Sequence, residues 1–181
     1  MSEQIKRIHR ELAYQGKIVK VYTDTMEMPD GHTAQWDFIQ HNGAAAVVPV
    51  MEDGTILMVR QYRNALERYT LEIPAGALDT VEEPGIHCAS RELEEETGYR
   101  SDHLRWLITV RTTVAFCNER IEIFVADHLV ASKQNLDEDE FIDVKPYTIE
   151  ELTDKIYAGE IEDSKTIAAL LAYEKKYRHH N

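Results

Sequence analysis

The stretch GALDTVEE at residues 76–83 leads, after a short gap, into RELEEETGY at residues 91–99, which predicts a loop followed by a helix rich in carboxylates. Residues three and four apart share one face of a helix, so Glu92, Glu95 and Glu96 project together. Like charges at this spacing destabilise an isolated helix. The face is therefore either simply solvated or occupied by a cation. A hard divalent ion fits the second alternative, because magnesium prefers carboxylate oxygens and shares its remaining positions with substrate phosphates.

Two glycines flank this acidic region and favour the second alternative. Gly76 ends a strand-like run that starts at Tyr69, where a glycine allows another group to approach the backbone closely. Gly98 is well placed to end the helix in a left-handed conformation. An isolated acidic run is usually a solvated helix face. The flanking glycines shift the balance towards a functional site.

Composition and charge restrict the class of protein. A length of 181 residues suits one domain or slightly more, and the net charge of −13 argues against a general nucleic-acid or anionic-membrane surface. No apolar run approaches the roughly 20 residues that span a bilayer, and the polar start is not a secretory signal. Cys88 and Cys117 form neither a CxxC nor a Cys/His metal spacing. We therefore expect a cytoplasmic protein without a disulfide, which binds neither nucleic acid nor a membrane.

Hydrophobic periodicity predicts the other elements. The chain is expected to begin with a short segment of helix or coil. Strands are predicted at residues 17–23 and 33–39, with a turn at Pro29-Asp30-Gly31, at 44–50 and 55–61 as a pair joined at Asp53-Gly54, and at 104–112 and 120–127; helices are predicted at 149–158 and 164–177. The expected fold class is α/β (α+β), a mixed β-sheet sandwiched between helices and preceded by a small N-terminal antiparallel sheet.

The acidic helix and its preceding loop resemble the signature box of the Nudix hydrolases. The second half of the box, from Arg91 to Tyr99, matches at every fixed position. In the first half, eight residues separate Glu82 from Arg91 where the family's box has seven, so either Glu82 or Glu83 takes the position of the box glutamate. The resemblance implies the Nudix fold and metal-dependent hydrolysis of a diphosphate linkage.

Flanking stretches resemble one branch of that family, the ADP-ribose and ADP-sugar pyrophosphatases. They are VRQYR at residues 59–63, LEIPAG at 71–76, DEDEFIDV at 137–144 and DSKT at 163–166. The resemblance implies an N-terminal β-sheet region at residues 1–42 for dimerisation and substrate binding, and a Nudix hydrolase domain at residues 43–181. It also implies a homodimer in which each site draws on both subunits.

The same resemblance assigns the metal site. It implies Mg²⁺, with Mn²⁺ as an alternative, held by Glu92, Glu96 and the backbone carbonyl of Ala75, with Glu95 as a further ligand or a close neighbour of the ligands. Arg91 would orient these glutamates through charge-assisted hydrogen bonds. The catalytic general base would be Glu138 or Glu140.

Three residues are expected to bind the substrate: Arg63, Trp36 and Glu72. The planar guanidinium of Arg63 matches phosphate oxygens, with a structural salt bridge as the alternative. Trp36 either stacks on adenine or anchors the core or a dimer interface.

One departure from this branch affects the substrate. The branch usually has a Ser-Pro-Gly-type loop after its box, and this chain has TVAFCNE at residues 113–119 instead. Three hypotheses follow. The first is an ADP-ribose pyrophosphatase that yields AMP and ribose 5-phosphate; the second is a pyrophosphatase for another nucleoside diphosphate sugar; the third is a non-catalytic nucleotide-binding protein.

Overall fold

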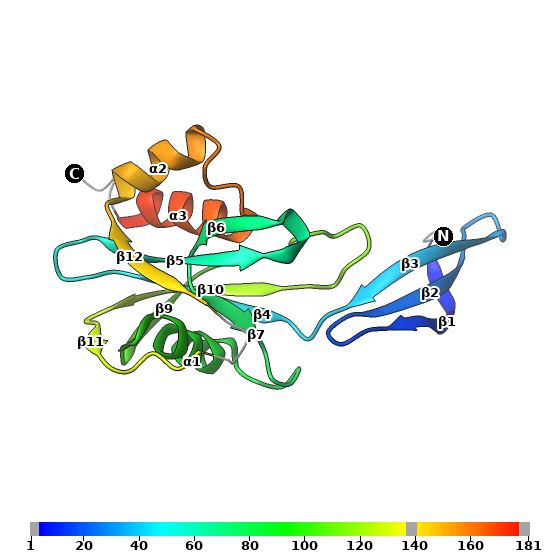
Figure 1. Cartoon of the computed structure of the whole chain (residues 1–181). Coiled ribbons are helices and arrows are strands. Elements are labelled where there is room, and N and C mark those ends of the chain that lie inside the picture. Colours follow the sequence, from blue (N-terminus) through cyan, green and yellow to red (C-terminus); the bar gives the residue numbers. More distant parts are fainter. Residues whose placement is uncertain (1–3, 137–140, 178–181) are drawn as a thin grey trace.

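The computed structural model describes residues 4–136 and 141–177. Its N-terminal part is an antiparallel sheet of β1 (Lys6–Gln15), β2 (Lys20–Glu27) and β3 (Thr33–Gln40), in that order. Figure 1 shows this sheet standing to one side of the remaining chain. The turn between β2 and β3 lies where it was predicted, because Gly31 has a φ of 86° and its N–H donates to the carbonyl of Met28.

The helix or coil expected at the start of the chain is wrong, because residues 6–15 form β1. This strand pairs with β2 along its length. At the centre of the pair, Arg10 donates from Nε and Nη2 to the two carboxylate oxygens of Asp24, both at 2.6 Å. Asp24 is buried, and the Arg10 guanidinium lies 3.8 Å from the centroid of the Phe38 ring. The local sequence of residues 6–15 favours neither strand nor helix, so their contacts with the neighbouring strand determine that they form a strand.

The rest of the protein is built on a four-stranded sheet of order β7-β4-β10-β9 and a three-stranded sheet of order β12-β5-β6. Their strands are β4 (Ala44–Pro49), β5 (Ile56–Arg63), β6 (Arg68–Glu72), β7 (Ala75–Ala77), β9 (His103–Val110), β10 (Ile121–Asp127) and β12 (Asp143–Tyr147). Strand β10 runs parallel to β4 and antiparallel to β9, so the first sheet is mixed. A short 3-10 helix η1 (Asn64–Leu66) and the small pair β8 (Tyr99–Arg100) and β11 (Val130–Ala131) complete the strand layer.

Strands β4 and β5 do not form the predicted pair. The turn between them is present, since Gly54 has a φ of 84° and the Met51 N–H donates to the Thr55 carbonyl. Only an isolated bridge between Val50 and Ile56 links the two strands, however. Every residue of β4 is buried, and a strand covered on both faces takes a central position, here between β7 and β10.

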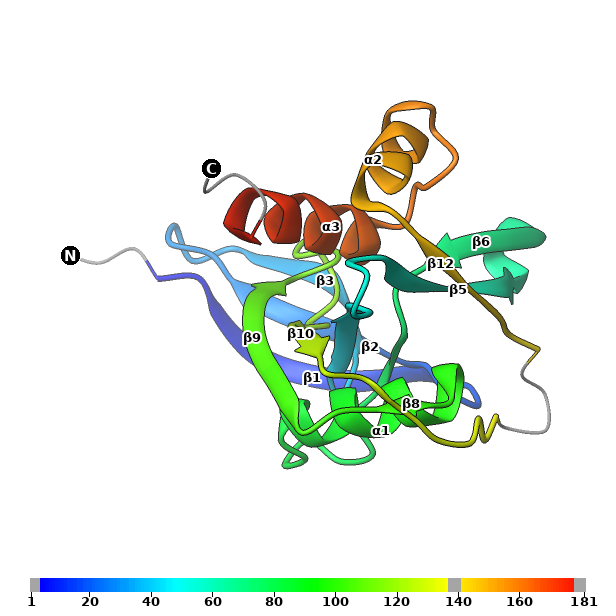
Figure 2. The same cartoon turned by 90° about the vertical axis from the view of Figure 1, so that its left-hand side faces the viewer.

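Three helices cover the strand layer: α1 (Gly85–Thr97), α2 (Ile149–Tyr157) and α3 (Ser164–Tyr177). Figures 1 and 2 show α1 on one side of the layer and both α2 and α3 on the other. Alternate residues of β4 face the two sides, because Ala46 and Val48 join the core beneath α2 and α3, while Ala45 and Val47 pack with residues of α1. The predicted sheet between helices is confirmed.

Local signals explain how the second helix begins. Thr148 and Glu151 form a capping box, in which the Glu151 N–H donates to the Thr148 hydroxyl and the Thr148 N–H donates to the Glu151 carboxylate. No helix within residues 4–136 or 141–177 combines the length and the apolar character that crossing a membrane requires. Cys88 and Cys117 are both free thiols.

Candidate active site

Helix α1 carries the acidic residues that the sequence singled out. Ala89 and Leu93 are fully buried beneath it and fix its orientation on the sheet. The helix ends at Gly98, whose φ of 72° gives the left-handed stop that was predicted. Because the buried side of α1 is set by these apolar residues, Glu92 and Glu96 are presented along the border with β7.

Arg91 ties two of these glutamates together. Its Nη1 donates to Glu92 Oε1 at 2.6 Å and to Glu95 Oε2 at 3.1 Å, while its Nη2 donates to the carbonyl of Ala77 at 3.2 Å. Burial lowers the pKa of Arg91, but the Glu92 and Glu95 carboxylates outweigh it, so the pKa is raised above its ordinary value. Arg91 thus stays charged and holds both carboxylates in place, as the orienting role expected for it requires.

Glu96 is the most buried of the three acidic residues, with only 3% of its surface exposed. Its Oε2 accepts the N–H of Ala75 at 3.0 Å. This bond joins the last turn of α1 to the first residue of β7, immediately after the chain leaves β6. The structure therefore places the Glu96 carboxylate against the backbone of Ala75.

The contact between α1 and β7 also explains why residue 76 is a glycine. A Cβ built on Gly76 would lie 2.0 Å from Glu92 Oε1, far inside van der Waals contact. The Glu92 carboxylate therefore rests directly against the backbone of β7, at a position where any side chain would displace it. The close approach expected at this glycine is present.

The structure also separates the two candidate box glutamates. Glu83 Oε2 accepts the N–H of Asp79 at 2.7 Å, and Glu83 Oε1 lies 3.8 Å from Arg91 Nη2. The Glu83 side chain is 16% exposed. Glu83 rather than Glu82 thus lies beside Arg91, at the edge of the carboxylate group.

A cavity of about 520 Å³ opens next to this border. Ala75 and Gly76 form part of its wall, so the α1 carboxylates adjoin it. Arg63, Glu72 and Lys165 line another part of the wall. The cavity is therefore lined by positively and negatively charged side chains and adjoins the contact between α1 and β7.

Glu72 is the centre of a buried charge network in this wall. Arg63 donates to both of its oxygens, Nε to Oε1 at 2.8 Å and Nη2 to Oε2 at 2.7 Å. Thr70 Oγ1 donates to Oε1 at 2.6 Å, and Lys165 Nζ donates to Oε2 at 2.5 Å. Burial raises the pKa of Glu72, but the Arg63 and Lys165 cations outweigh it and lower the pKa to about 2. Glu72 is therefore a carboxylate at any physiological pH.

Arg63 takes part in both alternatives that the sequence left open. It forms the structural ion pair with Glu72, yet it also lines the cavity, with its side chain 38% exposed. Its pKa is raised, first by the hydrogen bond to Glu72 and further by the charges of Glu96 and Asp163. A permanent positive charge consequently faces the hollow close to the α1 carboxylates.

Sequence reasoning assigned no role to Lys165. The Asp163–Thr166 stretch was recognised only as part of a resemblance, yet Lys165 is 7% exposed and contacts both Glu72 and Asp163. Asp163 also accepts the N–H and the hydroxyl of Thr166 at the start of α3. A buried lysine is rare, and no local sequence pattern marks one. Lys165 is buried because it pairs with Glu72, a carboxylate 93 residues earlier, and the sequence around Lys165 does not indicate that partner.

Trp36 lies apart from the α1 carboxylates within this chain. It is 48% exposed on β3 and lines a second hollow of about 630 Å³ together with Ala115 and Phe116. The Ile39 N–H donates to the Phe116 carbonyl at 2.7 Å, which fastens the residue 113–119 loop to β3. Glu138 and Glu140, the two candidate bases, lie outside the described residues.

The donor set of α1 fits a hard divalent cation. Glu92, Glu95 and Glu96 offer carboxylate oxygens, which Mg²⁺ and Mn²⁺ prefer. Glu92 and Glu95 both accept hydrogen bonds from the positively charged Arg91. Gly76 has no side chain, and the Glu92 carboxylate occupies the space that a Cβ would fill. Both features keep these carboxylates in place beside the cavity.

Comparisons with known proteins agree with this geometry. Residues 40–170 match the NUDIX domain family. The methanol dehydrogenase activator of Bacillus methanolicus is 42% identical over 168 residues, which cover 91% of this chain and 90% of that protein. The ADP-ribose pyrophosphatase of Bacillus subtilis is 39% identical over 167 residues, with the same coverage of 91% and 90%. The crystal structure of an ADP compounds hydrolase has the same fold, with a TM-score of 0.86 and 20% identity over 98% of this chain and 97% of that chain.

Proposed function

The chain belongs to the Nudix hydrolase family, and from this membership we propose that it hydrolyses the pyrophosphate of ADP-ribose to AMP and ribose 5-phosphate, with Mg²⁺ as its metal ion. The observation that carries the proposal is the likeness to the Bacillus subtilis ADP-ribose pyrophosphatase over nearly the whole chain. The carboxylate set of α1 argues against the non-catalytic alternative, because Arg91 and Gly76 hold it in place beside a cavity.

Nudix hydrolases generally need a divalent metal ion. We assign it to Glu92, Glu96 and the Ala75 carbonyl, with Glu95 beside them. A bound ion of this kind neutralises phosphate oxygens and lowers the pKa of a coordinated water. Mg²⁺ is the ion we expect, since all the proposed donors are oxygens, and Mn²⁺ is the alternative.

The remaining work falls to the chain's own residues. Arg91 keeps Glu92 and Glu95 oriented, and Arg63 and Lys165 supply positive charge to the wall along which the diphosphate would lie. Glu138 or Glu140 takes a proton from the attacking water. The water oxygen forms a bond to one phosphorus, and the bridging P–O bond breaks, which leaves two monophosphates.

The test is product analysis with purified protein and Mg²⁺. ADP-ribose, ADP-glucose, GDP-mannose and diadenosine polyphosphates are supplied side by side, and the release of nucleoside monophosphate is resolved by chromatography. We expect AMP to be released fastest from ADP-ribose. Faster turnover of another sugar nucleotide would move the function to that substrate, and no product from any of them would contradict the proposal.

A second candidate is hydrolysis of another nucleoside diphosphate sugar, and the residue 113–119 loop favours it. Thr112 and Glu119, at the two ends of this loop, line the main cavity and are joined by a hydrogen bond from the Thr112 hydroxyl to the Glu119 carboxylate. A loop of altered composition at the cavity wall changes the space around the sugar. The same substrate comparison separates the two candidates.

We also propose that residues 1–42 form a dimerisation and substrate region, that residues 43–181 form the hydrolase domain, and that the enzyme acts as a cytoplasmic homodimer. The N-terminal sheet exposes large apolar side chains, including Ile8 at 55%, Leu12 at 48% and Trp36 at 48%. Several large apolar side chains exposed on one small sheet favour a contact with another protein surface. A reducing compartment agrees with the two free thiols.

The dimer gives a testable prediction. Light scattering after size exclusion should report twice the chain mass of 20.9 kDa. Replacing Leu12 by glutamate on the exposed face of β1 should shift the protein to the monomer, because a charge would be buried in an apolar contact. Glutamate in place of Val81, which is 61% exposed in the loop before α1, is the matched control and should leave the mass unchanged. A monomeric unmodified protein would refute the dimer.

Gly76 gives a second prediction. In Gly76→Ala the new Cβ displaces the Glu92 carboxylate, so kcat/KM should fall by about 10- to 100-fold. The thermal midpoint should change little, because the displaced atoms are the far end of a flexible side chain. Gly159→Ala is the control, since Gly159 has a φ of 74° with open space around it. It should lose stability and keep its activity, and full activity of Gly76→Ala would contradict the role given to this border.

A further inference from the structure

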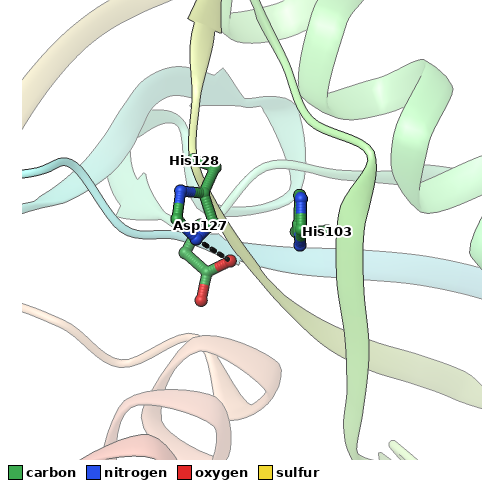
Figure 3. Close-up of side chains that lie close together, drawn as sticks. All are labelled: His103, Asp127 and His128. Carbon is green, nitrogen blue, oxygen red and sulfur yellow. Dashed lines mark ion pairs between the residues drawn. The ribbon is translucent and has the colours of Figure 1, made fainter.

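A group of metal-binding side chains lies at the ends of β9 and β10. His103, at the start of β9, is the register partner of Asp127, at the end of β10, and His128 follows Asp127 in the chain. Figure 3 shows the three side chains gathered between these two strands. Their ligand atoms all lie within 4.8 Å of one another, and within residues 4–136 and 141–177 no other three such residues come as close.

The backbone of His128 brings its ring into this group. Neighbouring residues of a strand point to opposite faces, so an extended His128 would point away from Asp127. Instead His128 has a φ of 52°, a left-handed conformation that is uncommon outside glycine. Its ring consequently lies 4.6 Å from that of His103, centroid to centroid, and its Nε2 lies 3.9 Å from Asp127 Oδ1.

Asp127 has one oxygen engaged and one without a hydrogen bond. Arg105 Nη2 donates to Oδ2 at 2.5 Å and so fixes the carboxylate. Oδ1 is buried, and no group in the described part of the chain donates a hydrogen bond to it. A buried carboxylate oxygen without a donor is costly, and such atoms in native proteins call for an explanation such as an ion.

The strand ends that carry these residues are joined by further hydrogen bonds to the backbone. The hydroxyl of buried Ser101 donates to the Asp127 carbonyl at 2.5 Å and accepts the N–H of His103 at 2.9 Å. The Val50 N–H donates to the carbonyl of Ala126, which anchors the end of β10 on the core side. The backbone positions of His103 and Asp127 are thus fixed by bonds that do not involve the proposed ligand atoms.

We propose that His103, Asp127 and His128 bind a divalent transition metal ion of the zinc class, separate from the catalytic ion. Two imidazoles and one carboxylate are the ligands such ions prefer. Zinc–nitrogen bonds of about 2.0–2.1 Å place tetrahedral ligand atoms roughly 3.4 Å apart, so the imidazoles need to close by about an ångström and a half. Rotation of the exposed His103 and His128 rings supplies this movement, with Asp127 Oδ1 as the fixed third ligand.

This site is remote from the proposed active site. Ile121 lines the main cavity at one end of β10, and Asp127 ends the same strand six residues later. At the rise of a β-strand this separates them by roughly 20 Å. The ligand chemistry also differs, because the α1 site offers oxygens that suit Mg²⁺, while two imidazole nitrogens favour zinc.

Zinc binding by the full chain tests the proposal. Titration calorimetry with Zn²⁺ in excess Mg²⁺, which keeps the α1 carboxylates occupied, should give one zinc per chain. His103→Gln and His128→Asn should each weaken binding at least about tenfold, and asparagine is chosen because it tolerates the left-handed backbone. Zn²⁺ should raise the thermal midpoint of the unmodified protein and lose this effect in both variants.

A matched control is present on the N-terminal sheet. His32 is an exposed histidine paired with Asp30, which provides one imidazole and one carboxylate without a second imidazole. His32→Gln should bind zinc like the unmodified protein. The proposal is overturned if no zinc binds in the presence of Mg²⁺, or if His103→Gln and His128→Asn bind zinc as tightly as His32→Gln does. Because these readouts do not depend on turnover, they stand or fall independently of the proposed hydrolase activity.

Discussion

Replacing Glu96 by glutamine is expected to lower kcat/KM for pyrophosphate hydrolysis at least about 100-fold while the fold persists. In the unmodified protein the Glu96 carboxylate accepts the Ala75 N–H at 3.0 Å. Glutamine has nearly the same size and keeps one oxygen that can accept this bond. The negative charge is lost, and one carboxylate oxygen is replaced by an NH₂ group. Because Glu96 is 3% exposed, a neutral group is easier to bury there, and this gain offsets the lost attraction to Arg63, so the free energy of unfolding should change little.

Steady-state kinetics over a range of Mg²⁺ concentrations, together with thermal unfolding, measure both effects. Glu94→Gln is the matched control on the same helix, because the Glu94 carboxylate accepts the hydroxyl of Ser132, which follows β11 and lies outside the cavity lining. This variant should retain its kcat/KM and its dependence on Mg²⁺. If Glu96→Gln turned over substrate at the full rate under saturating Mg²⁺, Glu96 would not be a metal ligand and the assignment of the α1 site would be wrong.

The part of this site that the sequence predicts well is local. The spacing of Glu92, Glu95 and Glu96 and the glycine at position 98 are properties of one helix, which the structure shows as α1. Helical periodicity depends on neighbours within one or two turns, so no distant partner is needed to recognise it. The role of Arg91 came from the resemblance to the Nudix box, and its two carboxylate partners are also local, one and four residues further on.

Elements whose partners are distant in the sequence were predicted less well. Strand β4 was expected to pair with the strand that follows it, but it lies parallel to β10, which is more than 70 residues away. Parallel pairing leaves no turn signal between the two strands, and an apolar run does not identify its partner. Segment 6–15 similarly shows its strand character only once β2 lies beside it.

The polar wall of the cavity was beyond sequence reasoning for a related reason. Glu72 was expected to bind substrate, but its engagement by Arg63 and Lys165 depends on contacts over 9 and 93 residues. Lys165 is ordinarily a surface type, so its burial follows from tertiary packing alone. The choice between Glu138 and Glu140 as general base stays a prediction, because both lie outside the described residues.

The buried network around Glu72 carries the other large expected effect. Glu72→Gln should lower the free energy of unfolding by about 3 kcal/mol at neutral pH, because Lys165, with a side chain 9% exposed, loses its main counter-charge. The expected loss is at the low end of the range for breaking a buried ion pair. Lys165 keeps its ion pair with Asp163, at 3.0 Å, and Arg63 is 38% exposed and therefore remains partly solvated. Urea unfolding measures it. Arg68→Ala, which removes an exposed pair with Glu162, is the control and should cost less than about 1 kcal/mol.

The same network predicts how stability depends on pH. Burial raises the pKa of Glu72, but Arg63 and Lys165 lower it to about 2 from an ordinary value of 4.5. A carboxyl with a lower pKa in the folded state binds fewer protons there, so its stabilisation is complete above about pH 4.5 and is lost as the pH falls towards about 2. Glu72→Gln has no such proton to bind. The unfolding free energies of the two proteins should therefore converge on acidification below pH 4.5, and a difference that stays constant from pH 7 to pH 3 would show that Glu72 is not held ionised by this pairing.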